Sequence, residues 1–164
     1  MGAESFFFNI ICERINVKQS ILERLDKIRE INQYYAYSSA LFFKRKLMDD
    51  NRYTYGKALV LDIVTNSDVT IISVEACFAN YRCNMKLSYE LYAEIKSTYN
   101  NVFLKFGDSI TDIPISIKSA EVFDTWLSST HKEKYEAFVD RYGELNINIL
   151  PSEFYEYIKK RFKR

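Results

Sequence analysis

Two adjacent runs of β-branched and apolar residues constrain the fold of this chain more than any other feature. The runs cover residues 58–65 and 69–78, and Asn66-Ser67-Asp68 separates them. Runs of this composition that are joined by a short polar segment are typical of a β-hairpin. Because parallel strands need a long crossover connection, this hairpin argues against a doubly wound parallel sheet.

The other segments alternate between strand-like and helix-like patterns. Further strands are predicted at residues 6–13, 102–106, 113–117 and 145–149, and the middle two form a second hairpin with Pro114 on an edge strand. Five helices are predicted. The first runs from Ser20 to about residue 47, the second follows an Asn84 cap, and the third follows Ser119. The fourth runs from His131 to Gly143 after a capping box formed by Thr130 and Glu133, and the fifth begins at Pro151. No linker-like tract divides the chain. We therefore expect a single α+β domain over residues 1–164, with a mostly antiparallel sheet built from two hairpins and helices packed on it.

Charge and apolar runs point away from a membrane. Lys and Arg number 23 and Asp and Glu 22, so the net charge of +1 favours neither a nucleic-acid nor a membrane partner. The longest apolar runs fall far short of the roughly 20 residues that span a bilayer. The first residues lack the basic region of a secretory signal, and the three Cys are an odd number, which argues against a disulfide framework. We expect a cytoplasmic protein.

Histidine and glycine are too scarce for most catalytic motifs. The chain has one His and four dispersed Gly, and it contains neither a phosphate-binding glycine loop nor a G-x-S-x-G elbow. His131, the single candidate base for a Ser or Cys nucleophile, falls in the exposed first turn of a predicted helix. A zinc enzyme with two His ligands is excluded by count. We expect no cofactor and no metal, and the sequence leans against an enzyme without deciding the matter.

Two carboxylates on the first hairpin leave a nuclease alternative open. Asp62 and Glu75 lie in paired strands, an arrangement that resembles the metal site of restriction-type nucleases. Those sites carry a Lys two residues after the second acid, and Cys77 stands there instead. The simpler interpretation places both carboxylates on the solvent face of a half-covered hairpin.

A basic cluster near the C-terminal end supports a nucleic-acid alternative. Five cations gather there beside aromatic rings, and such groups can grip phosphates and stack on bases. They are Lys159, Lys160, Arg161, Lys163 and Arg164. Cations at the C-terminus of a helix also interact favourably with its macrodipole, which is a structural reason for the same residues.

Aromatic residues are the strongest sign of a partner. The chain has 13 Tyr and 12 Phe, and helical or alternating spacing assigns many of these rings to the core. No single buried stripe accounts for the remainder, three of which (Tyr53, Tyr55 and Tyr81) fall in predicted loops. The tyrosines that we single out as candidate partner-binding residues are Tyr34, Tyr35, Tyr37, Tyr53, Tyr55, Tyr81, Tyr155 and Tyr157.

The sequence therefore favours a non-catalytic protein-binding domain. By analogy with other small α+β proteins, the specific hypothesis is an inhibitor of the immunity or antitoxin type, whose partner is a toxin. The alternatives are a nucleic-acid-binding or metal-dependent nuclease-like domain, and a secretion chaperone or effector. Self-association into a homo-oligomer stays open.

Overall fold

A six-stranded sheet organises the part of the chain that the structure describes. The structure is a computed structural model, and it describes residues 4–13, 25–27, 52–55, 58–65, 68–105 and 117–162. The strands are β1 (Ser5–Glu13), β2 (Leu25–Lys27), β3 (Arg52–Tyr55), β4 (Leu59–Thr65), β5 (Val69–Cys77) and β6 (Phe103–Lys105), in the spatial order β2-β3-β4-β5-β1-β6. Each pair of neighbours is antiparallel. The helices are α3 (Tyr81–Thr98), α4 (Ala120–Tyr142) and α5 (Pro151–Phe162). The predicted α+β class with an antiparallel sheet is confirmed.

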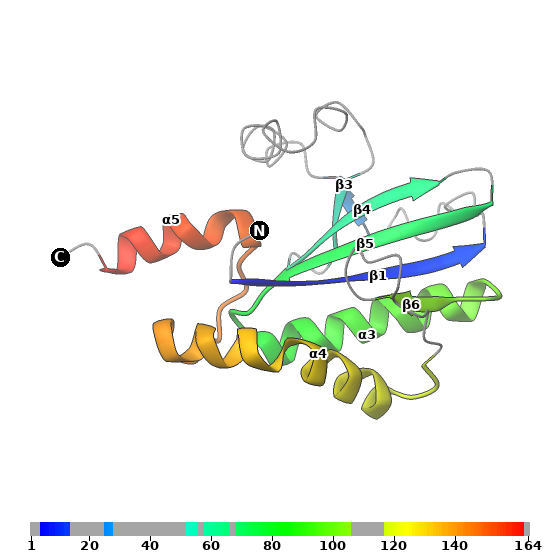
Figure 1. Ribbon diagram of the computed structural model, residues 1–164. Coiled ribbons are helices and arrows are strands. Elements are labelled where there is room, and N and C mark those ends of the chain that lie inside the picture. The colour runs from blue at the N-terminus through cyan, green and yellow to red at the C-terminus, as the bar shows by residue number, and fades with distance from the viewer. Residues whose placement is uncertain are drawn as a thin grey trace.

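The predicted first hairpin is present, and the N-terminal strand completes its core face. β4 pairs with β5 so that Leu61 lies opposite Val74, and β1 pairs with the other side of β5 so that Phe8 also lies opposite Val74. Alternate side chains of these strands are buried on one face: Phe6, Phe8, Ile10, Leu59, Leu61, Ile63, Ile72, Val74 and Ala76. Helices α3 and α4 lie side by side below the sheet in Figure 1, and α5 lies beyond the end of the sheet where β1 begins.

Aromatic rings fill much of the core between the sheet and the helices. Phe8 of β1 meets Phe123 of α4 edge to face, with ring centroids 5.7 Å apart. Phe78, which follows β5, contacts Phe138 at 5.8 Å, and Phe138 in turn contacts Phe154 of α5 at 5.4 Å. One continuous set of ring contacts therefore joins the sheet to α4 and α5, which accounts for part of the aromatic surplus of the sequence.

Helix α4 is continuous where the sequence predicted two helices. Ser119 caps it as expected, since its hydroxyl accepts from the Val122 amide at 3.3 Å, and Gly143 ends it with a φ of 75°. The predicted restart at His131 is wrong. Thr130 donates its hydroxyl to the Trp126 carbonyl at 2.6 Å, one turn back, and therefore stands inside the helix instead of capping a new one.

Helix α3 begins earlier than the sequence predicted. Its first residue is Tyr81, and the residue before it, Asn80, adopts the left-handed conformation (φ 55°) without a side-chain capping bond. Asn84 is therefore not a cap. Its buried side-chain amide donates to the carbonyls of Cys77 at 2.8 Å and Ala79 at 3.0 Å, which secures the turn between β5 and α3.

Three other segments differ from the prediction. Residues 25–27 form strand β2, paired with β3, where a helix was expected over 20–47, and the rest of that expected helix lies outside the described residues. Residues 52–55 form β3 where a loop was expected around Tyr53 and Tyr55. Residues 145–149 were predicted as a strand from their alternating apolar side chains, but they form none. Leu145 and Ile149 are buried, yet the segment does not pair with a strand of the sheet. The expected strand at 113–117 lies, apart from Ile117, outside the described residues.

Candidate functional site

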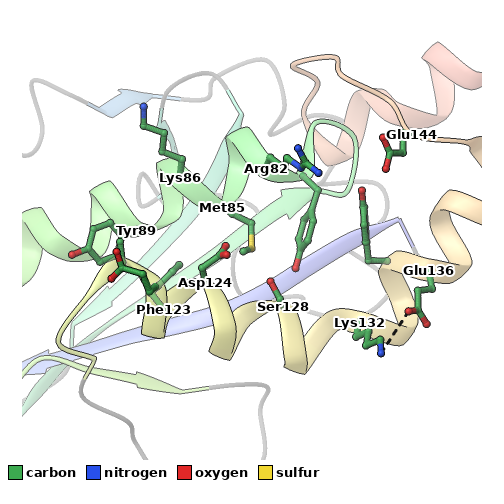
Figure 2. A pocket seen from close by; sticks show the side chains of 14 residues that line it. Arg82, Met85, Lys86, Tyr89, Phe123, Asp124, Ser128, Lys132, Glu136 and Glu144 are labelled. Carbon is green, nitrogen blue, oxygen red and sulfur yellow. Dashed lines mark ion pairs between the residues drawn. The ribbon is translucent and has the colours of Figure 1, made fainter.

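A groove of about 750 Å³ runs between α3 and α4 on the surface of the helical layer. Figure 2 shows side chains from both helices lining it. The lining residues are Tyr81, Arg82, Met85, Lys86, Tyr89, Ala120, Glu121, Phe123, Asp124, Ser128, Lys132, Tyr135, Glu136 and Glu144. Aromatic and apolar side chains thus share the groove with charged ones, a mixture that suits recognition of a ligand or a partner segment.

A stacked pair of tyrosines lies at one end of the groove. The rings of Tyr81 and Tyr135 are nearly parallel, with an interplanar angle of 26° and centroids 4.4 Å apart. Behind them, Phe78 contacts Tyr81 at 5.5 Å and Tyr135 at 5.8 Å, and Phe6 meets Tyr81 edge to face at 5.5 Å. Core rings therefore hold this end of the groove in place.

The Tyr81 hydroxyl is a buried donor in the groove. Tyr81 is 9% exposed, and its buried Oη lies next to the Ser128 hydroxyl. Burial raises the pKa of Tyr81 to about 12, the Ser128 hydroxyl opposes that rise, and the charge of Asp124 adds to it. The hydroxyl therefore stays protonated at neutral pH.

Charged side chains form the rim of the groove. Lys86 lies 3.9 Å from Glu90, and Lys132 lies 3.9 Å from Glu136. The pKa of Tyr135 is raised, mainly by burial and next by the negative charge of Glu144. The positive charge of Arg82 opposes this increase. The Glu144 carboxylate and the Arg82 guanidinium therefore both act on the same ring.

Of the tyrosines predicted to bind a partner, Tyr81 lines the groove and the others that the structure describes do not. Tyr81, expected in a loop, is the buried first residue of α3 and lines the groove. Tyr55 is half-buried and packs against the core from β3, and Tyr53 belongs to the same strand. Tyr34, Tyr35 and Tyr37 lie outside the described residues.

The two predicted tyrosines of α5 have partners within the protein. Tyr155 donates its hydroxyl to the Glu4 carboxylate at 2.6 Å, although its side chain is 43% exposed. Tyr157 accepts a hydrogen bond from the Arg161 guanidinium at 2.6 Å, and the same guanidinium lies over the Tyr157 and Phe162 rings. Both residues therefore contribute to intramolecular contacts, and neither lines the groove.

The basic cluster on α5 is partly engaged. Lys159 forms an ion pair with Glu156 at 2.7 Å, and Arg161 bonds to Tyr157 as described. Lys160 is exposed, and Lys163 and Arg164 lie outside the described residues. Two of the three described cations thus already have intramolecular partners.

The two acidic residues of the nuclease alternative lie on the same face of the sheet. Asp62 is opposite Ser73 in the β4–β5 register, and Glu75 is two residues further along β5, so their side chains are diagonal neighbours. Both are half-buried, on the face opposite α3 and α4. Within the described ranges, no three His, Cys, Asp or Glu side chains gather closely enough to hold a metal ion.

His131 is a core residue, and its prediction as an exposed residue at a helix start was wrong. It is 1% exposed and packs against the rings of Phe6 and Phe78. Its Nε2 lies 3.2 Å from the Phe7 carbonyl oxygen, so Nε2 carries the hydrogen. Burial lowers the pKa of His131 to about 4. The hydrogen bond to the Phe7 carbonyl opposes this decrease, and the positive charge of Lys134 adds to it. The ring is neutral at physiological pH.

Sequence reasoning missed most of the groove, although a signal was present. Along α4, every fourth residue lines the groove, and this row carries only small or charged side chains: Ala120, Asp124, Ser128, Lys132 and Glu136. Along α3, Tyr81, Met85 and Tyr89 have the same spacing. Rows at this spacing lie on one face of a helix. The small side chains of Ala120 and Ser128 leave the space that the groove occupies.

No family model matches this chain, and comparison with the curated proteins and with the solved structures found no match. In the described part of the chain, no helix has the length and apolar character needed to cross a membrane.

Proposed function

We propose that this protein is a non-catalytic binding domain that receives a segment of a partner protein in the groove between α3 and α4. The observation that carries the proposal is the composition of the groove, in which the stacked Tyr81–Tyr135 pair and a buried hydroxyl lie within a charged rim. Rigid aromatic anchors surrounded by polar groups are typical of the energetic centres of protein interfaces.

Within this class, the specific proposal is a cytoplasmic inhibitor of the immunity or antitoxin type, which occupies a toxin in a stoichiometric complex. The support is an analogy, since small α+β domains often have the binding of one other protein as their whole activity. A secretion chaperone or an effector would use the same groove differently, because the bound partner would keep its activity.

Two neighbouring serines of α4 provide a matched test of the groove. Ser128 lines the groove, whereas Ser129 is exposed and bonds to the Trp126 carbonyl at 2.9 Å. Ser128→Tyr would fill the groove without changing the charge, and Ser129→Tyr would add the same side chain outside it. Tagged protein from native cells identifies the partner by mass spectrometry, and calorimetry on the purified pair measures affinity and stoichiometry.

We expect a one-to-one complex that Ser128→Tyr weakens at least about tenfold, which corresponds to 1.4 kcal/mol, and that Ser129→Tyr leaves unchanged. Titration of the partner's own activity then tests the finer proposal, since an inhibitor abolishes that activity at one equivalent. Equal binding by both variants would show that the groove is not the interface. Full activity of the bound partner would exclude the inhibitor and favour the chaperone.

Nucleic-acid binding stays an alternative with its own test. A phosphate interface on α5 predicts salt-dependent binding that weakens in Lys160→Glu. For the nuclease version, metal-dependent cleavage should vanish in Asp62→Asn. Salt-dependent binding of nucleic acid that Ser128→Tyr does not change would favour this alternative over the proposed partner groove.

A further inference from the structure

We infer that the groove between α3 and α4 binds a cationic amphipathic α-helix of the partner protein. This inference rests on the proposed function and specifies the chemistry of the partner segment. Three properties of the groove support it: its shape, its charge and the position of its stacked rings.

The shape of the groove fits a helix. Tyr81 of α3 contacts Tyr135 of α4, and Tyr89 of α3 contacts Phe123, so the two helices are antiparallel where they line the groove. The α4 row from Ala120 to Glu136 extends for about 24 Å at 1.5 Å per residue. The furrow between two packed helices accepts the side-chain ridge of a third, and amphipathic helices bind such grooves through residues at i, i+3, i+4 and i+7. A helix of about 16 residues would match this length.

The charge of the groove selects a cationic helix. Two of its lysines lie near an acid, as Lys86 does beside Glu90 and Lys132 beside Glu136. Among the described residues, no ion pair involves the other four charged lining residues, which are Arg82, Glu121, Asp124 and Glu144. The lining as a whole carries four carboxylates and three cationic side chains, so its net charge is −1 although the whole chain carries +1. Complementary charge across an interface sets specificity and orientation.

The stacked rings mark the place for one cationic side chain. The charge of Asp124 raises the pKa of Tyr81, and the charge of Glu144 raises that of Tyr135, so each ring has a carboxylate within electrostatic reach. A Lys or Arg of the partner helix at this end would meet these two carboxylates beside the half-buried ring of Tyr135, and aromatic rings also attract cations. Arg82 acts on the same ring and provides one position for an acidic residue of the helix.

Synthetic peptides test this inference without knowledge of the natural partner. The probes are three fluorescently labelled peptides of about 16 residues. The first has a leucine stripe at helical spacing and a lysine polar face, the second has glutamate in place of each lysine, and the third has the composition of the first in an order without amphipathic spacing. Fluorescence anisotropy measures their affinities for the full chain, and amide chemical-shift changes locate the bound peptide.

We expect the lysine peptide to bind at least about tenfold more tightly than the glutamate peptide and the scrambled peptide, with shift changes concentrated on α3 and α4. Asp124→Lys should weaken the lysine peptide about tenfold and strengthen the glutamate peptide. Glu133→Lys makes the same charge change on an exposed residue of α4 that does not line the groove, and it should leave both affinities unchanged. Equal affinities for the lysine and glutamate peptides, equal effects of the two variants, or no binding would each overturn the inference.

The serine variants separate this inference from the proposed function. If Ser128→Tyr weakens the natural partner while the lysine peptide fails to bind, the groove is the interface and the inferred chemistry of its occupant is wrong. If Ser128→Tyr affects neither the partner nor the peptide, the proposed function and the inference both fall.

Discussion

The Tyr155 hydroxyl of α5 lies 2.6 Å from Oε2 of Glu4, although 151 positions of the sequence separate the two residues. Oε1 of the same carboxylate accepts from the Tyr142 hydroxyl of α4 at 3.2 Å, and the Glu4 carbonyl accepts from the Phe78 amide at 2.9 Å. Glu4 is 7% exposed. One buried residue therefore joins the beginning of β1 to the last turn of α4, to α5 and to the end of β5.

Removal of the Tyr155 hydroxyl should destabilise the fold. We expect Tyr155→Phe to lower the free energy of unfolding by about 1 kcal/mol, because the Glu4 carboxylate loses one of its two hydroxyl donors. Tyr157→Phe on the same helix is the control, since it removes a bond to Arg161 that is exposed to solvent. Urea unfolding of the three proteins measures the difference. Equal stabilities of the two variants would contradict this role of Glu4.

The same pair predicts a loss of stability at alkaline pH. The hydrogen bond to Glu4, aided by burial, raises the pKa of Tyr155 to about 12 from an ordinary value of 10. Between pH 10 and 12 the unfolded chain releases this proton while the folded protein retains it, so the free energy of unfolding falls as pH rises. Tyr155→Phe lacks this contribution, and its stability difference from the unmodified protein should shrink over that range. A difference that stays constant from pH 9 to 12 would argue against the raised pKa.

The sequence predicted best those features that depend on local patterns. The β4–β5 hairpin, the Ser119 cap of α4 and the stop at Gly143 each follow from neighbouring residues, and each is present. Strand β2 depends on pairing with β3, which lies far along the chain and which local periodicity does not encode. Thr130 and Glu133 have capping-box spacing, but the continuous packing of α4 on the core overrides that local signal.

The candidate site was even less accessible to prediction. Tyr81 was identified, but as a residue of a loop, because the left-handed turn at Asn80 starts the helix earlier than an Asn84 cap would. The stacked partner of Tyr81, Tyr135, lies on another helix and is not among the tyrosines singled out from the sequence. A groove between two helices depends on how they pack, and that information is contained in tertiary contacts.

Buried His131 predicts sensitivity to acid. Its pKa is about 4 in the folded protein, against an ordinary value of 6.5. Above pH 6.5 the ring is neutral in both the folded and the unfolded state. Between pH 6.5 and 4 the ring binds a proton only in the unfolded chain. The free energy of unfolding therefore falls as pH decreases, by up to about 3 kcal/mol. His131→Gln retains a donor for the Phe7 carbonyl without titrating. Its stability should therefore fall less steeply between pH 7 and 4.5, and parallel curves for the two proteins would contradict the buried neutral imidazole.

Asn84 should be among the costliest polar residues to replace. We expect Asn84→Ala to lower the free energy of unfolding by about 2–3 kcal/mol, because the buried carbonyls of Cys77 and Ala79 lose their side-chain donor. Asn148→Ala is the matched control. Asn148 is exposed, and its side-chain oxygen accepts one hydrogen bond from the side-chain amide of Asn80 at 2.7 Å. We expect a loss below about 0.5 kcal/mol for that variant. Similar losses in thermal or urea unfolding would show that Asn84 does not secure the β5–α3 turn.

The three free thiols should differ in reactivity. Burial raises the pKa of Cys12 to about 11 and that of Cys77 to about 12, so both stay protonated and covered at neutral pH. Cys83 is half-exposed on α3. Because the thiolate is the reactive form, a colorimetric thiol reagent at pH 8 should modify one cysteine rapidly in the native protein and all three in denaturant. Cys83→Ser should abolish the rapid phase, and a rapid phase that survives this substitution would contradict the assignment.

The position of β1 between two later strands has a consequence for how the protein is made. β1 lies between β5 and β6, and its residue Phe8 pairs with Val74. As the ribosome synthesises the chain, β1 leaves the exit tunnel long before β5, and its alternating rings have no strand to pair with until residue 77 has followed. Closing so long a loop slows folding. We therefore expect the apolar side chains of β1 to stay without their partner strand until β5 emerges, at a stage when neither helix of the groove exists.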